Sequence, residues 1–204
     1  MKDWSRLLSG SNKARVVSSL LRQAVSGSGF SGEGRHAAVL VPLLIANGEP
    51  SVLFTIRSTN LSRHRGQVSF PGGISDPHDA SLVATALRET SEELGVDPKT
   101  VEVWGELPTL PDRQKSSVIT PVLGLMTDIT SLVPNPAEVA EVFTLPIRHL
   151  AHPDNHRYTI FKGHSVRYPV FLGGPRKIWG LSGFILNMTL LQLLPPEFKY
   201  QSLT

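Results

Sequence analysis

Cysteine is missing from all 204 residues of the chain, which excludes disulfide bonds, a thiol nucleophile and thiolate-bound metal sites. Long apolar runs are missing as well, since none reaches the roughly 18 residues that a membrane-spanning helix needs. Aromatic residues make up only 7%, and no dense cluster of lysine and arginine is interleaved with them, so nucleic-acid binding is not expected. The net charge of +3 is compatible with a small anionic substrate.

The remaining composition, with 40% apolar and 18% charged residues, is that of a globular domain. Apolar runs, alternating segments and turn residues divide it into elements. We expect strands at 37–45, 51–58, 67–73, 101–107, 118–126, 141–147, 158–161 and 167–174, and helices at 81–94 and 178–194. Because strands and helices mix without regular alternation, the pattern predicts an α+β fold, with a mixed β-sheet flanked by helices.

The first 34 residues differ from the rest of the chain and precede a domain that we expect at 35–195, with a C-terminal tail at 196–204. Five basic residues stand in this segment, and Asp3 is its only acid before Glu33. Serine is frequent, and apolar residues between Val16 and Ala24 fall at helical spacing. Two interpretations follow: a mitochondrial targeting sequence, or an ordinary N-terminal helix that packs on the domain.

Three glutamates, Glu89, Glu92 and Glu93, crowd the second half of the helix expected at 81–94. At about 100° per residue, the stripe formed by Val83, Ala84, Leu87, Ser91 and Leu94 is the expected buried face, with the glutamates on the opposite face. A solvated acidic face would be the ordinary explanation.

Two features point instead to a cation site. The acids do not alternate with lysines, and a Pro-Gly-Gly turn that lets backbone approach a ligand precedes the helix. Clustered carboxylates without basic partners suit hard cations that prefer oxygen ligands, such as Mg²⁺ or Mn²⁺, and these cations commonly contact substrate phosphates too.

The stretch GGISDPHDASLVATALRETSEELGV, residues 72–96, resembles the Nudix box, the signature of the Nudix hydrolases. Residues 88–96 match the specific second half of that signature, Arg-Glu-apolar-x-Glu-Glu-x-Gly-apolar, apart from Thr90 at the first apolar position. The first half is one residue longer than the signature, so that Asp79 and Ala80 stand where a glutamate belongs. The resemblance implies the Nudix fold, an α/β/α sandwich.

A second stretch, LFTIRSTNLSRHRGQVSFPGG at residues 53–73, is similar to the element upstream of the box in the coenzyme A diphosphatases of this family. The whole resemblance covers about 36–195. It implies a metal-dependent diphosphatase that cleaves coenzyme A and acyl-coenzyme A to 3′,5′-ADP and 4′-phosphopantetheine or its acyl form. The alternatives are the same chemistry on another dinucleotide, such as NADH or ADP-ribose, and an inactive nucleotide-binding module.

The resemblance also implies roles for individual residues. Glu89 and Glu93 would be the core ligands of Mg²⁺ or Mn²⁺, Glu92 a further ligand, and Arg88 would orient these glutamates. The general base would be a box glutamate or an acid outside the box, Glu138 or Glu141. Contacts with the substrate would come from backbone glycines and from arginines that suit phosphate: Gly72, Gly73, Arg57, Arg63 and Arg65.

The expected partner is a small molecule, with no nucleic acid and no membrane span, and we expect a monomer or homodimer. Similarity to this subfamily favours the mitochondrion for the N-terminal segment.

Overall fold

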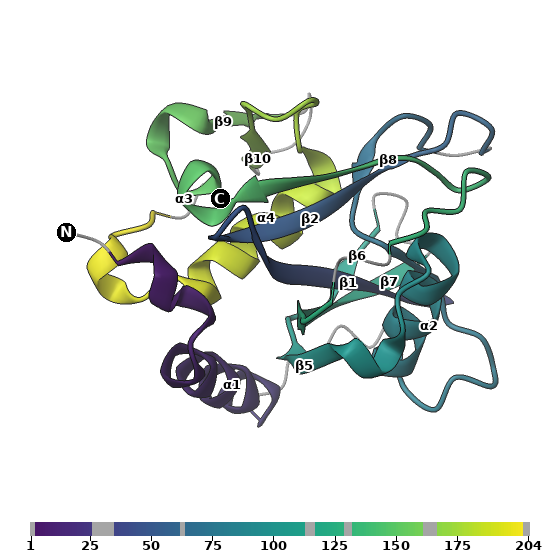
Figure 1. Ribbon diagram of the computed structural model, residues 1–204, viewed down its shortest axis with the longest axis horizontal. Coiled ribbons are helices and arrows are strands. Elements are labelled where there is room, and N and C mark those ends of the chain that lie inside the picture. Colours follow the sequence, from purple (N-terminus) through teal and green to yellow (C-terminus); the bar gives the residue numbers. More distant parts are fainter. Residues whose placement is uncertain are drawn as a thin grey trace.

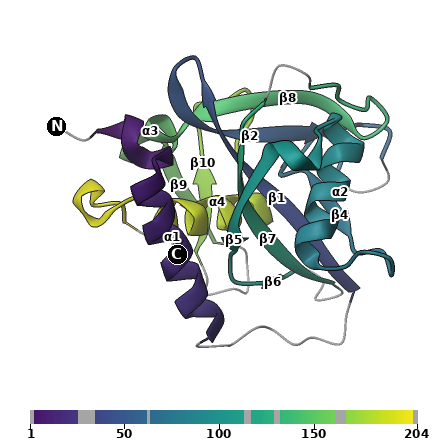
Figure 2. The same ribbon diagram turned by 60° about the horizontal axis from the view of Figure 1, so that its bottom comes forward.

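The computed structural model describes residues 3–25, 35–61, 64–112, 117–128, 132–160 and 167–201. A central mixed sheet lies between helices that cover its two faces (Figures 1 and 2). This arrangement confirms the expected class, a mixed β-sheet flanked by helices. No helix of the described ranges is long and apolar enough to cross a membrane.

The main sheet follows the order β3-β2-β1-β7-β5, with β4 beside β1, β6 beside β7 and β8 beside β2. Only β1 and β7 run parallel, while the other pairs are antiparallel. β9 and β10 form a separate hairpin. The strands are β1 (Arg35–Ala46), β2 (Glu49–Arg57), β3 (Val68–Ser69), β4 (Gly72–Ile74), β5 (Val101–Glu106), β6 (Leu110–Pro111), β7 (Ser117–Met126), β8 (Val139–Pro146), β9 (His156–Thr159) and β10 (Tyr168–Phe171).

The helices expected at 81–94 and 178–194 are present within two residues of their predicted ends, whereas the short helices at 4–8, 98–100, 147–150, 153–155 and 196–198 were not expected. The helices are η1 (Trp4–Leu8), α1 (Gly10–Val25), α2 (Leu82–Leu94), η2 (Pro98–Thr100), α3 (Ile147–Leu150), η3 (Pro153–Asn155), α4 (Gly180–Leu193) and η4 (Pro196–Phe198). α2 begins where the Ser81 hydroxyl accepts a hydrogen bond from the Ala84 backbone, and it ends at Gly95, whose φ of 70° is left-handed.

Strand β1 is buried on both faces because successive side chains point to opposite sides. Val41 and Leu43 belong to the core beneath α1 and α4, whereas Leu40 and Leu44 belong to the core beneath α2. The continuous apolar run of this strand therefore contributes side chains to two hydrophobic layers.

The single strand expected at 67–73 is two short strands, β3 and β4, which pair with different partners. β3 pairs with β2, and β4 crosses to pair with β1. Pro71 lies between them; it has no N–H to donate, and its carbonyl accepts a hydrogen bond from Leu40 at 2.9 Å. This switch brings the glycines of β4 to the face of the sheet that α2 covers.

The N-terminal segment forms a helix that packs on the domain, as one of the two interpretations expected. Leu7, Val16 and Leu20 are buried in the core that α4 shares. η1 and η4, from opposite ends of the chain, lie side by side (Figure 1), with the rings of Trp4 and Phe198 4.7 Å apart. Targeting by this segment remains a prediction.

Residues 196–201, which we expected to form part of a tail, also contact the domain. Phe198 is buried, and the Tyr200 hydroxyl donates to the side-chain oxygen of Asn187 at 2.9 Å.

Candidate active site

Helix α2 packs on the sheet with a face different from the one expected. Thr85, Ala86, Thr90, Glu93 and Leu94 are its buried residues. The expected stripe was only partly right: Leu94 is buried, and Val83 and Leu87 are half-buried and pack against the same core. Ala84 and Ser91 are half-buried toward the outer face of the helix. A groove of about 440 Å³ borders that outer face. The glutamates therefore do not share one solvent face: Glu93 is 3% exposed, whereas the Glu92 side chain is 54% exposed.

Two glycines of β4 allow close approaches, one to a carboxylate under α2 and one to the neighbouring strand. A Cβ on Gly73 would lie 2.4 Å from a carboxylate oxygen of Glu89. A Cβ on Gly72 would lie 2.3 Å from the Ala38 carbonyl oxygen of the neighbouring strand. The backbone of Gly72 also gives a hydrogen bond to Glu93. Both glycines were expected to contact the substrate through their backbone, and they lie against the two glutamates expected as core metal ligands.

Arg88 gathers three acidic side chains around one guanidinium. Its Nη1 donates to both carboxylate oxygens of Glu92, at 3.2 and 3.1 Å, and its Nη2 lies 2.9 Å from a carboxylate oxygen of Glu89. Its Nε and Nη2 donate to Asp79. These bonds hold the positive charge of Arg88 in place and raise its pKa above the usual range. The structure thus provides the contacts expected of Arg88 as the residue that orients the glutamates.

Asp79 is the residue of the site whose role the sequence left unassigned. Its side chain is 7% exposed and accepts hydrogen bonds from Arg88, from the Thr85 hydroxyl at 2.9 Å and from the Asp76 backbone at 2.9 Å. These donors, Arg88 foremost, hold the pKa of Asp79 well below its usual range. Asp79 ends a turn in which its N–H donates to the Asp76 carbonyl at 3.0 Å, within the half of the box that is one residue longer than the signature. The only sequence signal for its role was an acid nine positions before Arg88.

Glu93 is a buried acid in a negatively charged setting. Burial raises the pKa of its carboxyl group to about 8, and the carboxylates of Glu138 and Glu89 act in the same direction, against a lowering by Arg57. Burial likewise raises the pKa of Glu89, although Arg88 opposes it. Within the described residues, the only ion-pair partner of Glu93 is Arg57, whose Nη1 lies 3.8 Å from a carboxylate oxygen.

The segment 132–138 brings Glu138 to this cluster. The backbone of this segment caps the C-terminal end of α2. The Val133 N–H donates to the Leu94 carbonyl and the Asn135 N–H to the Glu93 carbonyl, both at 2.8 Å. The Asn135 side-chain amide then donates to the Glu138 carboxylate at 3.2 Å. Glu138 was among the expected candidates, whereas no sequence signal pointed to Asn135, which lies in an irregular segment without a periodic pattern.

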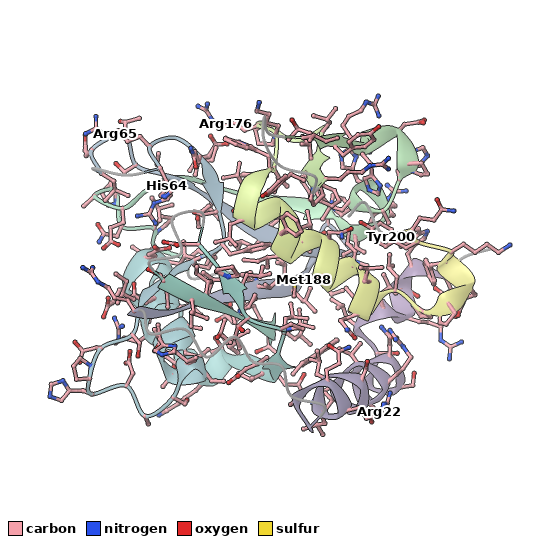
Figure 3. All side chains as sticks on the ribbon, turned by 180° about the vertical axis from the view of Figure 1, so that it is seen from behind. Arg22, His64, Arg65, Arg176, Met188 and Tyr200 are labelled. Carbon is pink, nitrogen blue, oxygen red and sulfur yellow. The ribbon has the colours of Figure 1, made fainter. Side chains whose placement is uncertain are left out.

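The other expected site residues are less closely tied to the cluster. Arg65 is exposed on the β2–β3 loop and points outward (Figure 3); its Nε donates to the Leu61 carbonyl. Glu141 is exposed on β8. Arg63 lies outside the described residues.

The donor set suits a hard divalent cation. Glu93 is a buried carboxylate with raised pKa, and Glu89 and Glu138 add oxygen donors and negative charge. The Glu89 carboxylate fills the space between Gly73 and α2. A Cβ on residue 73 would occupy that same space. Among the described residues, no three His, Asp or Glu side chains already stand at coordination spacing. Binding a cation therefore calls for side-chain adjustment within the cluster.

Comparison with known sequences identifies the same region. A family model described as NUDIX domain matches residues 34–162. The mouse protein named mitochondrial coenzyme A diphosphatase NUDT8 is 48% identical over 173 residues, which is 82% of this chain and 81% of that protein. The human protein of the same name is 50% identical over 168 residues, or 80% of this chain and 71% of that protein.

More distant proteins agree in sequence and in fold. Nudix hydrolase 3 of Caenorhabditis elegans is 39% identical over 181 residues, covering 80% of this chain and 75% of that protein. The crystal structure of a MutT/nudix family protein from Enterococcus faecalis superposes with a TM-score of 0.51 at 17% identity. That superposition covers 91% of this chain and 72% of the other, and it shows a common fold.

Proposed function

This chain belongs to the Nudix family, and on that premise we propose that it hydrolyses the pyrophosphate bond of coenzyme A and acyl-coenzyme A. The products would be 3′,5′-ADP and 4′-phosphopantetheine or its acyl form. The names and 48–50% identity of the mouse and human relatives support this substrate class. Within the molecule, the observation that carries the proposal is Glu93, a buried carboxylate among other acids on the box helix.

Nudix hydrolases depend on divalent metal ions, and we assign Mg²⁺ or Mn²⁺ to Glu89 and Glu93, with Glu92 as a further ligand. The cation supplies positive charge that neutralises the pyrophosphate oxygens and lowers the pKa of water. Arg88 holds Glu89 and Glu92 in place, and Asp79 holds Arg88. The burial of Glu93 keeps competing water away from the carboxylate and strengthens its attraction for a cation.

The remaining residues of the site would handle the substrate and its proton. Arg57 suits a phosphate oxygen because its guanidinium lies at the cluster, and Arg65 adds a positive charge on the loop that follows β2. Arg63 is proposed for the same role from its place in the sequence alone. The attacking water needs a proton acceptor. We favour two of the expected residues for this role: Glu92, which is exposed beside Arg88, and Glu138, whose charge acts on Glu93.

The test is a substrate panel on two proteins, the wild type and Glu93→Gln, with either MgCl₂ or MnCl₂. Coenzyme A, acetyl-coenzyme A, NADH and ADP-ribose are each followed by chromatography of the products. We expect cleavage of the coenzyme A species by the wild type and a fall in kcat of about a hundredfold or more in Glu93→Gln. Glu197→Gln, which changes an exposed acid in η4, serves as the matched control and should retain activity.

Each result has a distinct meaning. If the wild type cleaves NADH or ADP-ribose but no coenzyme A species, the proposed substrate is wrong and the metal assignment stands. Full activity in Glu93→Gln would overturn the metal assignment. The metal that gives the higher kcat/KM at equal concentration decides between Mg²⁺ and Mn²⁺.

We further propose that the protein resides in the mitochondrion, as its mouse and human relatives are named to do. The basic, amphipathic N-terminal segment is the part of the chain that suits this destination. Imaging of the full-length chain with a C-terminal tag, beside a variant that lacks residues 1–25, tests the proposal. A cytosolic signal from the full-length chain would overturn it.

A further inference from the structure

Arg57 stands at an irregularity of the sheet, at the end of β2. The pairing of β2 with β8 shifts between Ile56, opposite Glu141, and Arg57, opposite Val139. Such bulges turn a side chain away from the regular alternation of the strand. The backbone of Arg57 is fixed on the other side, because its N–H donates to Gln67 and its carbonyl accepts from Gly66, both at 3.0 Å. The bulge and these backbone hydrogen bonds therefore fix the position of Arg57 at the end of β2.

The side chain of Arg57 is held by charge more than by hydrogen bonds. Its Nη1 lies 3.8 Å from Glu93, which is an ion-pair distance but too long for a hydrogen bond. Its Nε is buried and has no hydrogen-bond partner within the described residues. A buried donor without an acceptor is costly. Arg57 therefore lacks an acceptor of the kind that a phosphate oxygen provides.

A divalent ion on Glu93 would bring a second positive charge to the carboxylate that Arg57 already pairs with in the fold. Such an ion would therefore lie within a few ångströms of the Arg57 guanidinium. Like charges at that separation in a mostly buried setting repel strongly. A shift of the Arg57 side chain from Glu93 toward a phosphate would relieve this repulsion and supply the missing acceptor.

We propose that Arg57 competes with the divalent cation for Glu93, so that metal binding frees Arg57 for a substrate phosphate. This inference rests on the proposed function, since it takes Glu93 as a metal ligand. It makes the two binding events cooperative: the metal displaces Arg57 from the carboxylate, and the phosphate removes the guanidinium that opposes the metal. Arg57 then acts as a substrate-binding residue that also sets metal affinity.

Calorimetric titration of MnCl₂ in the absence of substrate tests the competition. We compare wild type, Arg57→Met and Arg57→Lys, with Arg148→Met as a control that removes a positive charge from α3, where Arg148 pairs with Glu49. Arg57→Met should bind Mn²⁺ about fivefold more tightly than wild type, because the competing charge is gone. Arg57→Lys and Arg148→Met should stay within about twofold of wild type. In the activity assay, both Arg57 variants should raise KM for coenzyme A.

Equal or weaker Mn²⁺ binding by folded Arg57→Met overturns the inference. Far-ultraviolet circular dichroism shows whether Arg57→Met is folded. If it is not, Arg57→Lys decides: tighter Mn²⁺ binding by Arg57→Lys than by wild type, or an unchanged KM for coenzyme A, overturns the inference. Glu93→Gln separates this failure from that of the proposed function. If Glu93→Gln binds Mn²⁺ like wild type, the metal site itself is wrong. If it binds weakly while Arg57→Met shows no gain, only the competition is wrong.

Discussion

Asp79 accepts two hydrogen bonds from Arg88, at 3.0 Å from Nε and 3.1 Å from Nη2, and so ties the turn before helix α2 to the middle of that helix. The same guanidinium contacts Glu89 and Glu92. Asp79 thus acts on the candidate metal ligands through Arg88, as a positioning residue.

Replacing Asp79 by Asn should lower the metal affinity and kcat together, each by about tenfold, because Arg88 loses the charged partner that fixes it. Manganese titration by calorimetry and initial rates with coenzyme A provide the two readouts. Asp79→Glu restores the charge and should recover part of both. Asp154→Asn, an exposed acid in η3, controls for the loss of one negative charge. A normal metal affinity in Asp79→Asn would mean that Arg88 keeps its place without Asp79.

Gly73→Ala should damage the site more than the fold. The added Cβ would overlap the Glu89 carboxylate, so we expect a fall of about tenfold or more in Mn²⁺ affinity. The matched control is Gly10→Ala, since a Cβ at Gly10 meets nothing within 4 Å. Thermal unfolding and Mn²⁺ titration of both variants distinguish the effects. Wild-type metal affinity in Gly73→Ala would show that Glu89 can move aside without consequence.

Local patterns predicted the elements well, for identifiable reasons. The apolar run at 37–45 is a strand buried on both faces, and Ser81 and Gly95 mark the ends of α2 by capping chemistry that depends only on nearby residues. Pro71 accounts for the one strand that divides in two.

Prediction of the buried face from residue polarity was wrong at the candidate site. A projection that assigns apolar residues to the core placed Glu93 in solvent, but α2 packs on glycines that leave room for carboxylates beneath it. Departures of this kind are expected at functional sites. The pair of Arg57 with Glu93 depends on tertiary structure and could not be read from spacing.

Acidification should destabilise the protein through His156. Burial lowers the pKa of its imidazole, which packs edge-on against Phe171 and Tyr200. Below the ordinary value of 6.5 the unfolded chain takes up a proton before the folded chain does, so the free energy of unfolding falls as the pH drops. At higher pH the imidazole is neutral in both states, and this contribution is constant.

The measurement is the difference in Tm between about pH 7.5 and about pH 5.5, which should be smaller in His156→Gln than in wild type. His78→Gln, whose ring is exposed, should keep the wild-type difference. An equal pH dependence in wild type and His156→Gln would exclude His156 as the titrating group.

Arg15→Met should lower stability, because Arg15 Nη2 donates to the Gln192 and Leu193 carbonyls at 2.8 Å in the last turn of α4. Loss of these bonds should cost about 1–2 kcal/mol, or a fall in Tm of about 2–8 °C for a chain of this size. Arg6→Met, which removes an exposed charge from η1, should leave Tm nearly unchanged. Equal Tm values for wild type and Arg15→Met would show that water replaces the guanidinium at no cost.

The bond between the Asn12 side-chain amide and the Leu193 carbonyl joins residues 181 positions apart. Residue 193 is synthesised long after residue 12, so α1 cannot complete its contacts with α4 until the intervening domain has been made. Its contact with β5, where Lys13 pairs with Glu102, becomes available earlier. The N-terminal helix is thus secured in two stages, in an order set by the direction of translation, and the proposed targeting role would belong to the interval before the second stage.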